Sequence, residues 1–243
     1  MSPPAGLAPA PAPAVVASRV EEVRRRIRAT GRDPATVRLV AVTKGFDAGA
    51  VTAALAAGVD DIGENYAAEL VAKAAHFAGA RADGASPLPR WHFLGAVQRR
   101  RVRDLAALVG WWQTLARTVE GEAIAGRAPG ATVLVEVDVS GVPGRNGCPP
   151  AGVPGLVRSL VALELDVRGL MVVAPPGPPE VARAAFRTTA RLGADLGLAE
   201  LSMGMSQDFE VALEEGATMV RVGQALFGPR PTHAGADRGS PTT

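Results

Sequence analysis

Eight short apolar runs alternate with Ala/Leu-rich helical segments along this chain, and each run ends in a polar or glycine-containing turn. We predict strands at residues 37–43, 60–63, 91–95, 111–115, 132–139, 167–173, 200–203 and 218–222. Helical segments lie near 48–57, 65–78, 97–108, 118–126, 150–163, 179–195, 207–215 and 224–227. Strands that alternate with helices form parallel βαβ units. Eight such strands within about 190 residues predict an α/β fold with a single (β/α)8 TIM barrel, rather than a doubly wound sheet.

Residues 15–30 show helical periodicity and predict an extra helix at the start of a barrel domain that spans residues 15–230. The Pro/Ala-rich residues 1–14 and the Pro/Gly/Ser/Thr-rich residues 231–243 are predicted to be disordered tails. The fourth strand is the least distinct, because Trp111-Trp112-Gln113 also suits the start of a helix. No G-x-G-x-x-G motif follows the first strand, which disfavours dinucleotide binding.

The composition excludes several classes of protein. No apolar run approaches the ~20 residues that a membrane-spanning helix needs. The start of the chain also lacks the basic and apolar regions of a secretory signal. A net charge of +2 is too small to indicate nucleic-acid binding by itself. The single cysteine, Cys148, cannot form an internal disulfide, which suits a reducing compartment, so we expect a cytoplasmic protein.

Lys44 is the sharpest candidate for covalent chemistry. The chain has only two lysines, Lys44 and Lys73, so an imine has only two possible attachment points. Lys44 ends the first predicted strand, and the C-terminal ends of the strands build the active face of a barrel of this kind. Partial desolvation favours the neutral amine, which attacks a carbonyl carbon to form an imine. The alternative, which position alone favours, is a surface lysine that closes a strand.

The predicted loops after the seventh and eighth strands suit a phosphate group. Ser206 is expected to cap the helix after strand seven, with Asp208 in its first turn, and helix N-termini bind phosphate. Gly223, after strand eight, lets a second backbone segment approach closely. Barrels often hold phosphate between these two loops. The alternative is an ordinary capped helix and a glycine turn, but together with Lys44 the loops indicate a phosphate-bearing aldehyde.

Arg221 lies inside the apolar run 219–222, where its permanent charge must meet an acceptor or an anion. If it faces a pyridine nitrogen, it donates a hydrogen bond and keeps that nitrogen unprotonated. The ring is then a poorer electron sink, which limits its chemistry. The alternative is a buried structural ion pair with Glu136 or Asp138.

Six motifs, in order along residues 15–230, resemble the pyridoxal 5′-phosphate (PLP) homeostasis protein family, the YggS/PROSC type, whose barrel is similar to that of alanine racemase. They are LVAVTK at 39–44, IGENY at 62–66, WHFLG at 91–95, GLM at 169–171, LSMGMS at 201–206 and VRVG at 220–223. The resemblance implies a fold type III PLP barrel. It also implies that the protein acts in intracellular PLP (vitamin B6) homeostasis and amino-acid balance.

The resemblance also implies a set of cofactor-binding residues. Lys44 would hold PLP as a Schiff base, and Ser206 and Gly223 would hold its phosphate. Arg221 would face the ring nitrogen. The remaining pocket-lining residues implied by the family are Asn65, Met205 and Val222. The implied partners are PLP, apo PLP enzymes and free amino acids, with no nucleic acid and no membrane, and we expect a monomer.

Several positions depart from the family pattern. Thr43 precedes the lysine where serine is common, which keeps the hydroxyl. After Gly95 the family usually has an Asn-Lys pair, which arginines replace here within Val97-Gln98-Arg99-Arg100-Arg101. Similarity in the fourth strand is also poor. These changes concern contacts at the rim of the site rather than the imine.

We expect a PLP carrier rather than an enzyme. Two-base racemisation needs a second acid or base on the opposite face of the substrate, and alanine racemase takes it from an added β-domain. This chain ends soon after the eighth predicted strand, so we expect no such domain, and Tyr66 is not placed like the missing base. His92 suits a packed barrel histidine better than a proton carrier. The enzymatic alternative is a slow amino-acid racemase or lyase.

Two further features are expected to be structural. The basic cluster 99–103 suits a solvated helix face better than an RNA-binding surface, because no aromatic residues are interleaved with it. Cys148 is expected to be an exposed loop thiol. It has no paired cysteine and no His-Cys spacing, so we expect no metal site.

Overall fold

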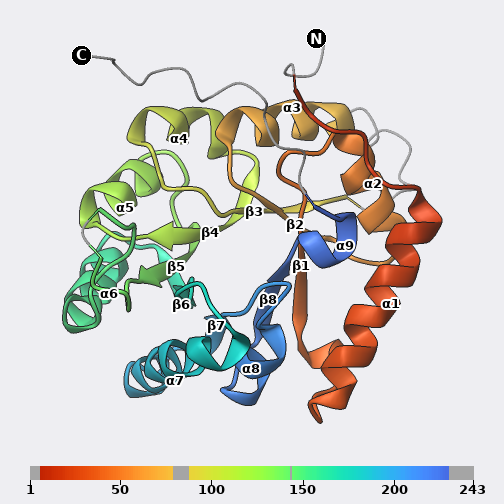
Figure 1. Ribbon diagram of the computed structural model, residues 1–243. Coiled ribbons are helices and arrows are strands. Elements are labelled where there is room, and N and C mark those ends of the chain that lie inside the picture. The colour runs from red at the N-terminus through yellow and green to blue at the C-terminus, as the bar shows by residue number, and fades with distance from the viewer. Residues whose placement is uncertain (1–5, 79–87, 143, 230–243) are drawn as a thin grey trace, which may run out of the picture.

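The computed structural model describes residues 6–78, 88–142 and 144–229. Eight parallel strands form one closed barrel, in which each strand pairs with the next along the chain and the last pairs with the first (Figure 1). The strands are β1 (Arg38–Val42), β2 (Asp61–Glu64), β3 (Arg90–Phe93), β4 (Val109–Leu115), β5 (Thr132–Val137), β6 (Asp166–Val172), β7 (Glu200–Ser202) and β8 (Met219–Val222). The predicted (β/α)8 barrel is therefore confirmed.

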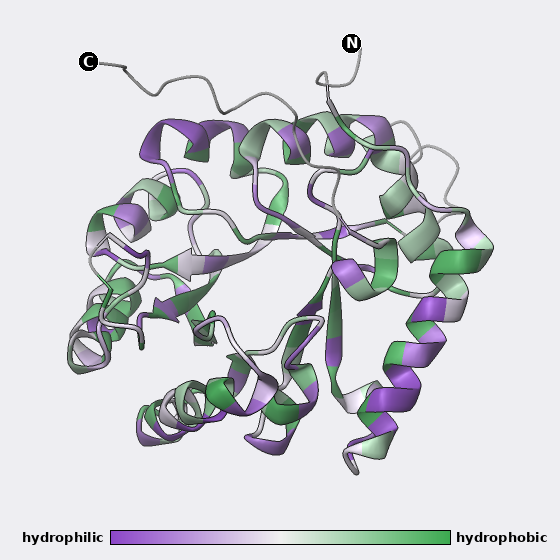
Figure 2. Cartoon of the chain, viewed as in Figure 1, coloured by the Kyte–Doolittle hydropathy of each residue, from purple (hydrophilic) through white to green (hydrophobic). Residues whose placement is uncertain are grey.

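Helices alternate with the strands and surround the barrel (Figure 1). They are α1 (Pro13–Ala29), α2 (Ala48–Ala56), α3 (Ala67–Ala78), α4 (Arg99–Leu105), α5 (Thr118–Ala125), α6 (Val153–Ala162), α7 (Pro179–Asp195), α8 (Phe209–Glu214) and α9 (Gln224–Phe227). Figure 2 shows apolar and polar residues alternating along α1 and a polar stretch on α4. None of the helices in the described ranges combines the length and apolarity that crossing a membrane requires.

The extra helix predicted at the start of the barrel is α1. Its apolar face consists of Val16, Val20, Val23 and Ile27, all of which are buried. The spacing of these residues places them on one side of the helix, which packs against α2, α8 and α9. Burial of this face therefore joins the first helix to elements from both ends of the chain.

The prediction of a disordered tail over residues 1–14 is wrong for residues 6–14. Ala8 forms a parallel bridge to the β1–α2 loop: its N–H donates to Gly45 O, and Asp47 N–H donates to Ala8 O, both at 2.9 Å. This pairing could not be predicted from the proline- and alanine-rich composition, because a single bridge needs backbone groups rather than particular side chains. The rest of this tail and the predicted C-terminal tail lie outside the described residues.

β4 is a strand, so the alternative helix start at Trp111 is wrong. Trp111 and Gln113 lie on one face of the strand, and both contact His92 of β3. Trp112 lies on the opposite face, where it is fully buried and makes an edge contact with Phe93. Only a strand turns alternate residues to opposite faces in this way.

The barrel interior holds polar side chains where branched apolar residues are usual. Asp61, His92, Gln113, Ser202 and Arg221 are all buried, and they come from five different strands. Gln113 of β4 and Ser202 of β7 bond to each other although their strands are not neighbours, so they meet across the interior. The interior therefore contains a polar network rather than a purely apolar core.

Gly169→Ala is expected to destabilise the barrel. A Cβ atom at Gly169 of β6 would overlap the backbone carbonyl of Glu200 in the paired strand β7. We expect a loss of about 3 kcal/mol in unfolding free energy by urea denaturation, at the upper end of typical overpacking costs. Gly110→Ala in β4 is the control, because the nearest atom to its added Cβ is 3.7 Å away. Equal stability of the two variants would contradict this account.

Candidate functional site

The turn that carries Lys44 begins directly after β1 and is fixed on both sides. The preceding residue, Thr43, is fully buried, and its Oγ1 donates to Glu64 Oε1 at 2.5 Å. The following residue, Gly45, donates its N–H to Glu69 Oε2 at 2.9 Å. Lys44 itself is half-buried. Two carboxylates from neighbouring elements therefore fix the backbone on either side of this lysine.

Lys73 of α3 holds these carboxylates together. Its Nζ donates to Thr43 O at 2.8 Å and to Glu64 Oε1 at 2.5 Å, and it lies 3.4 Å from Glu69 Oε2. The lysine is only 2% exposed. Its ammonium is therefore bound in a buried ion pair beside the turn that carries Lys44.

Burial also affects the Glu64 carboxyl of this cluster. It raises the pKa of the Glu64 carboxyl above its usual value, against the opposing effects of the Lys73 ammonium and the Thr43 hydroxyl. Glu64 Oε2 is buried and has no hydrogen-bond partner among the described residues. A charge placed here is stable only while Lys73 remains beside it.

Asn65 and Tyr66 follow β2 at the same end of the barrel. Asn65 is half-buried, whereas Tyr66 is 56% exposed at the rim. A Cβ atom at Gly95, after β3, would overlap the backbone carbonyl of Asn65. The glycine thus allows the two loops to meet closely, next to the turn that carries Lys44.

Ser206 lies between the loops after β7 and β8. Its Oγ accepts a hydrogen bond from Ala225 N at 3.1 Å, at the start of α9. Gly223 precedes α9, and a Cβ atom there would lie 3.1 Å from Val42 O at the end of β1. The contacts therefore bring a hydroxyl, a glycine backbone and the end of β1 together, as the sequence predicts.

The prediction that Ser206 caps the helix after β7 is wrong, because Asp208 takes that position. Asp208 is not in the first turn. Its carboxylate instead accepts from Met205 N at 2.6 Å and closes the turn before α8. Burial raises the pKa of this carboxyl, against the effect of that backbone bond. Met205 is itself 37% exposed at the rim.

Arg221 is buried and ties together the ends of three strands. Its Nη1 donates to Ser202 O at 2.6 Å and to Ser202 Oγ at 2.8 Å, and its Nη2 donates to Val172 O at 2.8 Å. Burial lowers the pKa of the guanidinium to about 10, so it stays charged at neutral pH. Val222 lies on the opposite face of β8 within the hydrophobic core, so only its backbone can line the site.

The alternative of a structural ion pair for Arg221 is wrong. No carboxylate among the described residues lies within ion-pairing distance of its guanidinium. Glu136 accepts from Asn146 instead, and Asp138 accepts from Ser140. Carbonyl and hydroxyl oxygens thus satisfy three of its donors, and Glu136 and Asp208 act on its charge only from beyond ion-pairing distance.

Cys148 is buried, so the prediction of an exposed loop thiol is wrong. Its backbone forms a parallel bridge with Val137: Cys148 N donates to Glu136 O at 2.7 Å, and Asp138 N donates to Cys148 O at 2.9 Å. Burial raises the pKa of the thiol. Within the part of the chain that the structure describes, no group of His, Cys, Asp and Glu side chains has the arrangement of a metal site.

The basic cluster 99–103 forms α4, as the expectation of a solvated helix face requires. Arg99, Arg100 and Arg103 are exposed. Arg101 and Arg103 pair with Asp104 at 3.2 and 3.3 Å. Part of the cluster charge is thus neutralised within the helix.

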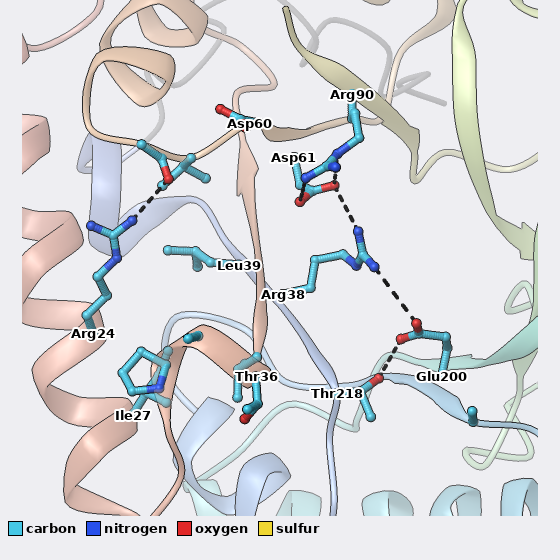
Figure 3. A pocket seen from close by; sticks show the side chains of 16 residues that line it. Arg24, Ile27, Thr36, Arg38, Leu39, Asp60, Asp61, Arg90, Glu200 and Thr218 are labelled. Atoms are coloured by element: carbon cyan, nitrogen blue, oxygen red, sulfur yellow. Dashed lines mark hydrogen bonds and ion pairs between the residues drawn. The ribbon is translucent and has the colours of Figure 1, made fainter. Parts of the chain in front are cut away.

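Figure 3 shows a pocket of about 630 Å³ at the end of the barrel where the strands begin, whereas Lys44 follows the end of β1. It is formed around the N-terminal ends of strands, where Arg38, Asp61, Arg90, Glu200 and Thr218 lie. None of the residues predicted to bind a cofactor lines it. Sequence reasoning identified the C-terminal face and missed the polar interior that connects it to this pocket.

Comparisons with known proteins agree with the geometry. The profile of the alanine racemase N-terminal domain matches residues 16–231. The pyridoxal phosphate homeostasis protein of Pseudomonas aeruginosa is 40% identical over 227 residues, covering 88% of this chain and 96% of that protein. A protein of Bifidobacterium adolescentis, described as unknown, has a crystal structure with a TM-score of 0.80 at 31% identity, covering 88% of this chain and 95% of that one.

A structure of PipY from Synechococcus elongatus with PLP bound is similar as well. Its TM-score is 0.74 at 31% identity, over 88% of this chain and all (100%) of that one. A lysine/ornithine decarboxylase of Vibrio vulnificus, at 15% identity and a TM-score of 0.65, shares the fold alone.

Lys73→Met is expected to destabilise the protein by about 3–5 kcal/mol, because it leaves the Glu64 carboxylate buried without its cation. The double variant Lys73→Met/Glu64→Gln removes both charges and should recover most of this loss in urea unfolding at neutral pH. Arg25→Met is the control, because the Arg25–Glu22 pair is exposed. Its expected cost is small, because solvent screens an exposed pair. A similar small loss for Lys73→Met would exclude a structural role for the buried pair.

Neutral His92 is expected to make stability sensitive to acid. Burial lowers the pKa of its imidazole from the usual 6.5, so the unfolded chain takes up the proton first as pH falls. This stabilisation is complete above the pKa of His92 in the unfolded protein and is lost as pH falls below that value. The slope for one proton is at most about 1.4 kcal/mol per pH unit.

His92→Gln should remove this contribution, because its amide can keep both hydrogen bonds of the neutral ring but cannot titrate in this range. The measurement is the difference in unfolding free energy between wild type and variant as a function of pH. This subtraction isolates His92 from the buried carboxyls. A difference that does not change between neutral pH and about pH 5 would show that His92 is not held neutral.

Proposed function

Because the chain belongs to the pyridoxal phosphate homeostasis protein family, we propose that it binds PLP as a Schiff base on Lys44 and serves in intracellular PLP homeostasis. The observation that carries this proposal is the convergence of three chemical groups at adjoining strand ends. They are the amine of Lys44 after β1, the hydroxyl of Ser206 after β7, and the guanidinium of Arg221 in β8. The aldehyde of PLP can react with the amine, its phosphate can bind the hydroxyl, and its ring nitrogen can accept from the guanidinium.

Lys44 is the attachment point in this proposal. Its Nζ condenses with the aldehyde carbon of PLP, forming a carbon–nitrogen double bond and releasing one water molecule. The bonds to Thr43 and Gly45 hold the backbone on both sides of the lysine. Lys73 does not compete for the aldehyde, because its ammonium is buried and bound by Glu64 and Thr43 O.

The phosphate would lie between the loops after β7 and β8. Ser206 Oγ and the backbone around Gly223 provide its hydrogen-bond donors, and the small size of glycine leaves room for close approach. Asn65 and Met205, both at the rim, would line the remaining pocket together with the backbone of Val222. The residues present therefore fit a phosphorylated aldehyde.

Arg221 would donate to the ring nitrogen of PLP. The three hydrogen bonds to Ser202 and Val172 leave at least two of its five N–H donors for a ligand. A permanently charged donor keeps a ring nitrogen unprotonated, and PLP then withdraws electrons from a bound amino acid less effectively. This environment favours holding the cofactor over rapid turnover.

The wider role follows from the same site. We propose that residues 15–230 form the PLP-binding unit, that the protein is a cytoplasmic monomer, and that PLP passes between it and apo PLP enzymes or free amino acids. The partly exposed position of Lys44 at the open end of the barrel supports such an exchange, because solvent reaches part of this residue. The same amine chemistry reverses when water or another amine attacks.

Lys44→Ala and Lys44→Arg are expected to abolish the covalent yellow complex with PLP. Arginine keeps the positive charge but cannot form the imine. Lys44→Arg therefore distinguishes the covalent bond from the electrostatic attraction of PLP to this position. The measurement is the visible absorbance of the protein with added PLP, before and after borohydride, with mass spectrometry to locate the reduced adduct. Wild type should carry the adduct on Lys44. A wild-type protein that remains colourless with PLP would contradict the proposal.

A further inference from the structure

Five buried polar side chains form a continuous hydrogen-bonded chain through the barrel interior. It runs from Arg221 near the C-terminal face to Asp61 at the pocket on the opposite face, where Figure 3 shows Asp61 between Arg90 and Arg38. Its links are Arg221 Nη1 to Ser202 Oγ at 2.8 Å, Ser202 Oγ to Gln113 Oε1 at 2.7 Å, Gln113 Nε2 to His92 Nδ1 at 2.6 Å, and His92 Nε2 to Asp61 Oδ1 at 2.8 Å.

The donors and acceptors in this chain all point one way. A guanidinium only donates, so Ser202 Oγ accepts from Arg221 and gives its own hydrogen to Gln113 Oε1. The Gln113 amide nitrogen then faces His92 Nδ1 as a donor, which requires that ring nitrogen to be unprotonated. His92 therefore carries its proton on Nε2 and donates it to Asp61.

Protonation of both ring nitrogens of His92 would disrupt this hydrogen-bonded chain. A doubly protonated His92 would point an N–H at the N–H of Gln113. Rotating the Gln113 amide would relieve that contact, but it would turn an N–H toward Ser202 and remove the acceptor of the Ser202 hydroxyl. It would also break the bond from Gln113 Nε2 to Met219 Sδ at 3.0 Å. The protonation state of His92 is therefore linked to the orientation of the Ser202 hydroxyl, which accepts from Arg221.

Burial favours the neutral form of His92, and it outweighs the Asp61 carboxylate, which accepts from Nε2 and acts to raise the pKa of the ring. Asp61 from β2 faces Nε2, Gln113 from β4 faces Nδ1, and Trp111 stacks on the ring at 5.7 Å. The charges of Arg38 from β1 and Arg90 from β3 oppose protonation. Burial acts to raise the pKa of the Asp61 carboxyl, but hydrogen bonds from His92 and Arg90 outweigh it and hold this pKa below its usual value.

We propose that His92 and Gln113 are positioning residues that, through Ser202, hold Arg221 in the orientation in which it receives the ring of PLP. The inference rests on the proposed function and deepens it. Among the described residues no carboxylate lies within ion-pairing distance of Arg221, and Glu136 and Asp208 act on it only from farther away, so the oxygens bonded to it decide where its donors point. The chain fixes one of these oxygens and anchors it to an ionised carboxylate at the far end of the barrel.

The direction of the chain is tested on the apoprotein, without PLP. Imidazole nitrogens are labelled with ¹⁵N, and long-range ¹H–¹⁵N correlation spectra are recorded between about pH 6 and 8. The protein has three histidines, and His92→Gln identifies the signals of His92. We expect an Nε2–H ring that does not titrate in this range. An Nδ1–H ring or an imidazolium would overturn the proposal.

The link to Arg221 is tested with Ser202→Ala, which breaks the chain two bonds away from His92. In the apoprotein it should shift the Nδ1 resonance of His92, because the Gln113 amide loses its fixed donor. It should also raise the dissociation constant for PLP about tenfold, as expected when a hydrogen bond to a charged group is lost. Ser159→Ala is the matched control, because that hydroxyl bonds to Gly155 O in the outer helix α6. It should change neither quantity.

A second pair of variants covers the case in which Ser202→Ala does not fold. His92→Leu removes both hydrogen bonds and should weaken PLP binding, whereas His92→Gln can keep both and should recover most of the affinity lost in His92→Leu. Equal affinity of these two variants would overturn the positioning role.

The NMR readouts separate the two proposals. A wild type that binds no PLP, yet has the expected His92 tautomer and its response to Ser202→Ala, rejects the cofactor and supports the chain. A wild type that binds PLP on Lys44, with His92 unresponsive to Ser202→Ala, supports the cofactor and rejects the chain.

Discussion

The buried charge of Arg221 is the constraint on which the interior of this barrel depends. An arginine inside a closed barrel cannot lose its proton at neutral pH, so the surrounding strands must supply oxygens. Val172 and Ser202 provide these at the ends of β6 and β7. The need to satisfy Ser202 in turn brings Gln113 into the interior. One charged side chain thus explains why the core is polar where barrels are usually apolar.

A second buried charge fixes the other half of the site. Lys73 lies outside the barrel wall in α3, yet its ammonium reaches the backbone carbonyl of Thr43 and the carboxylates of Glu64 and Glu69. Because these groups flank Lys44, the outer helix determines where the end of β1 lies. The two lysines therefore have different roles, one in holding the turn and one at the open face.

The prediction succeeded where a residue and its strand position were enough. A lysine that ends an apolar strand, a glycine after β8 and an arginine within β8 all lie at the expected face, because βα alternation determines which strand ends share one side. It failed where a partner distant in the sequence decides the outcome. Ser206 bonds to Ala225 rather than capping α8, and Cys148 is buried because its backbone pairs with Val137.

By itself, the sequence determined the fold class, the order of the strands and the family resemblance, since periodicity and local motifs are properties of neighbouring residues. Only the tertiary structure decided which polar groups meet. Gln113 and Ser202 are 89 positions apart and lie on strands that are not adjacent, and they touch because the barrel closes. The direction of their hydrogen bonds, and with it the tautomer of His92, depends on that closure, because a donor is assigned only when its acceptor is in place.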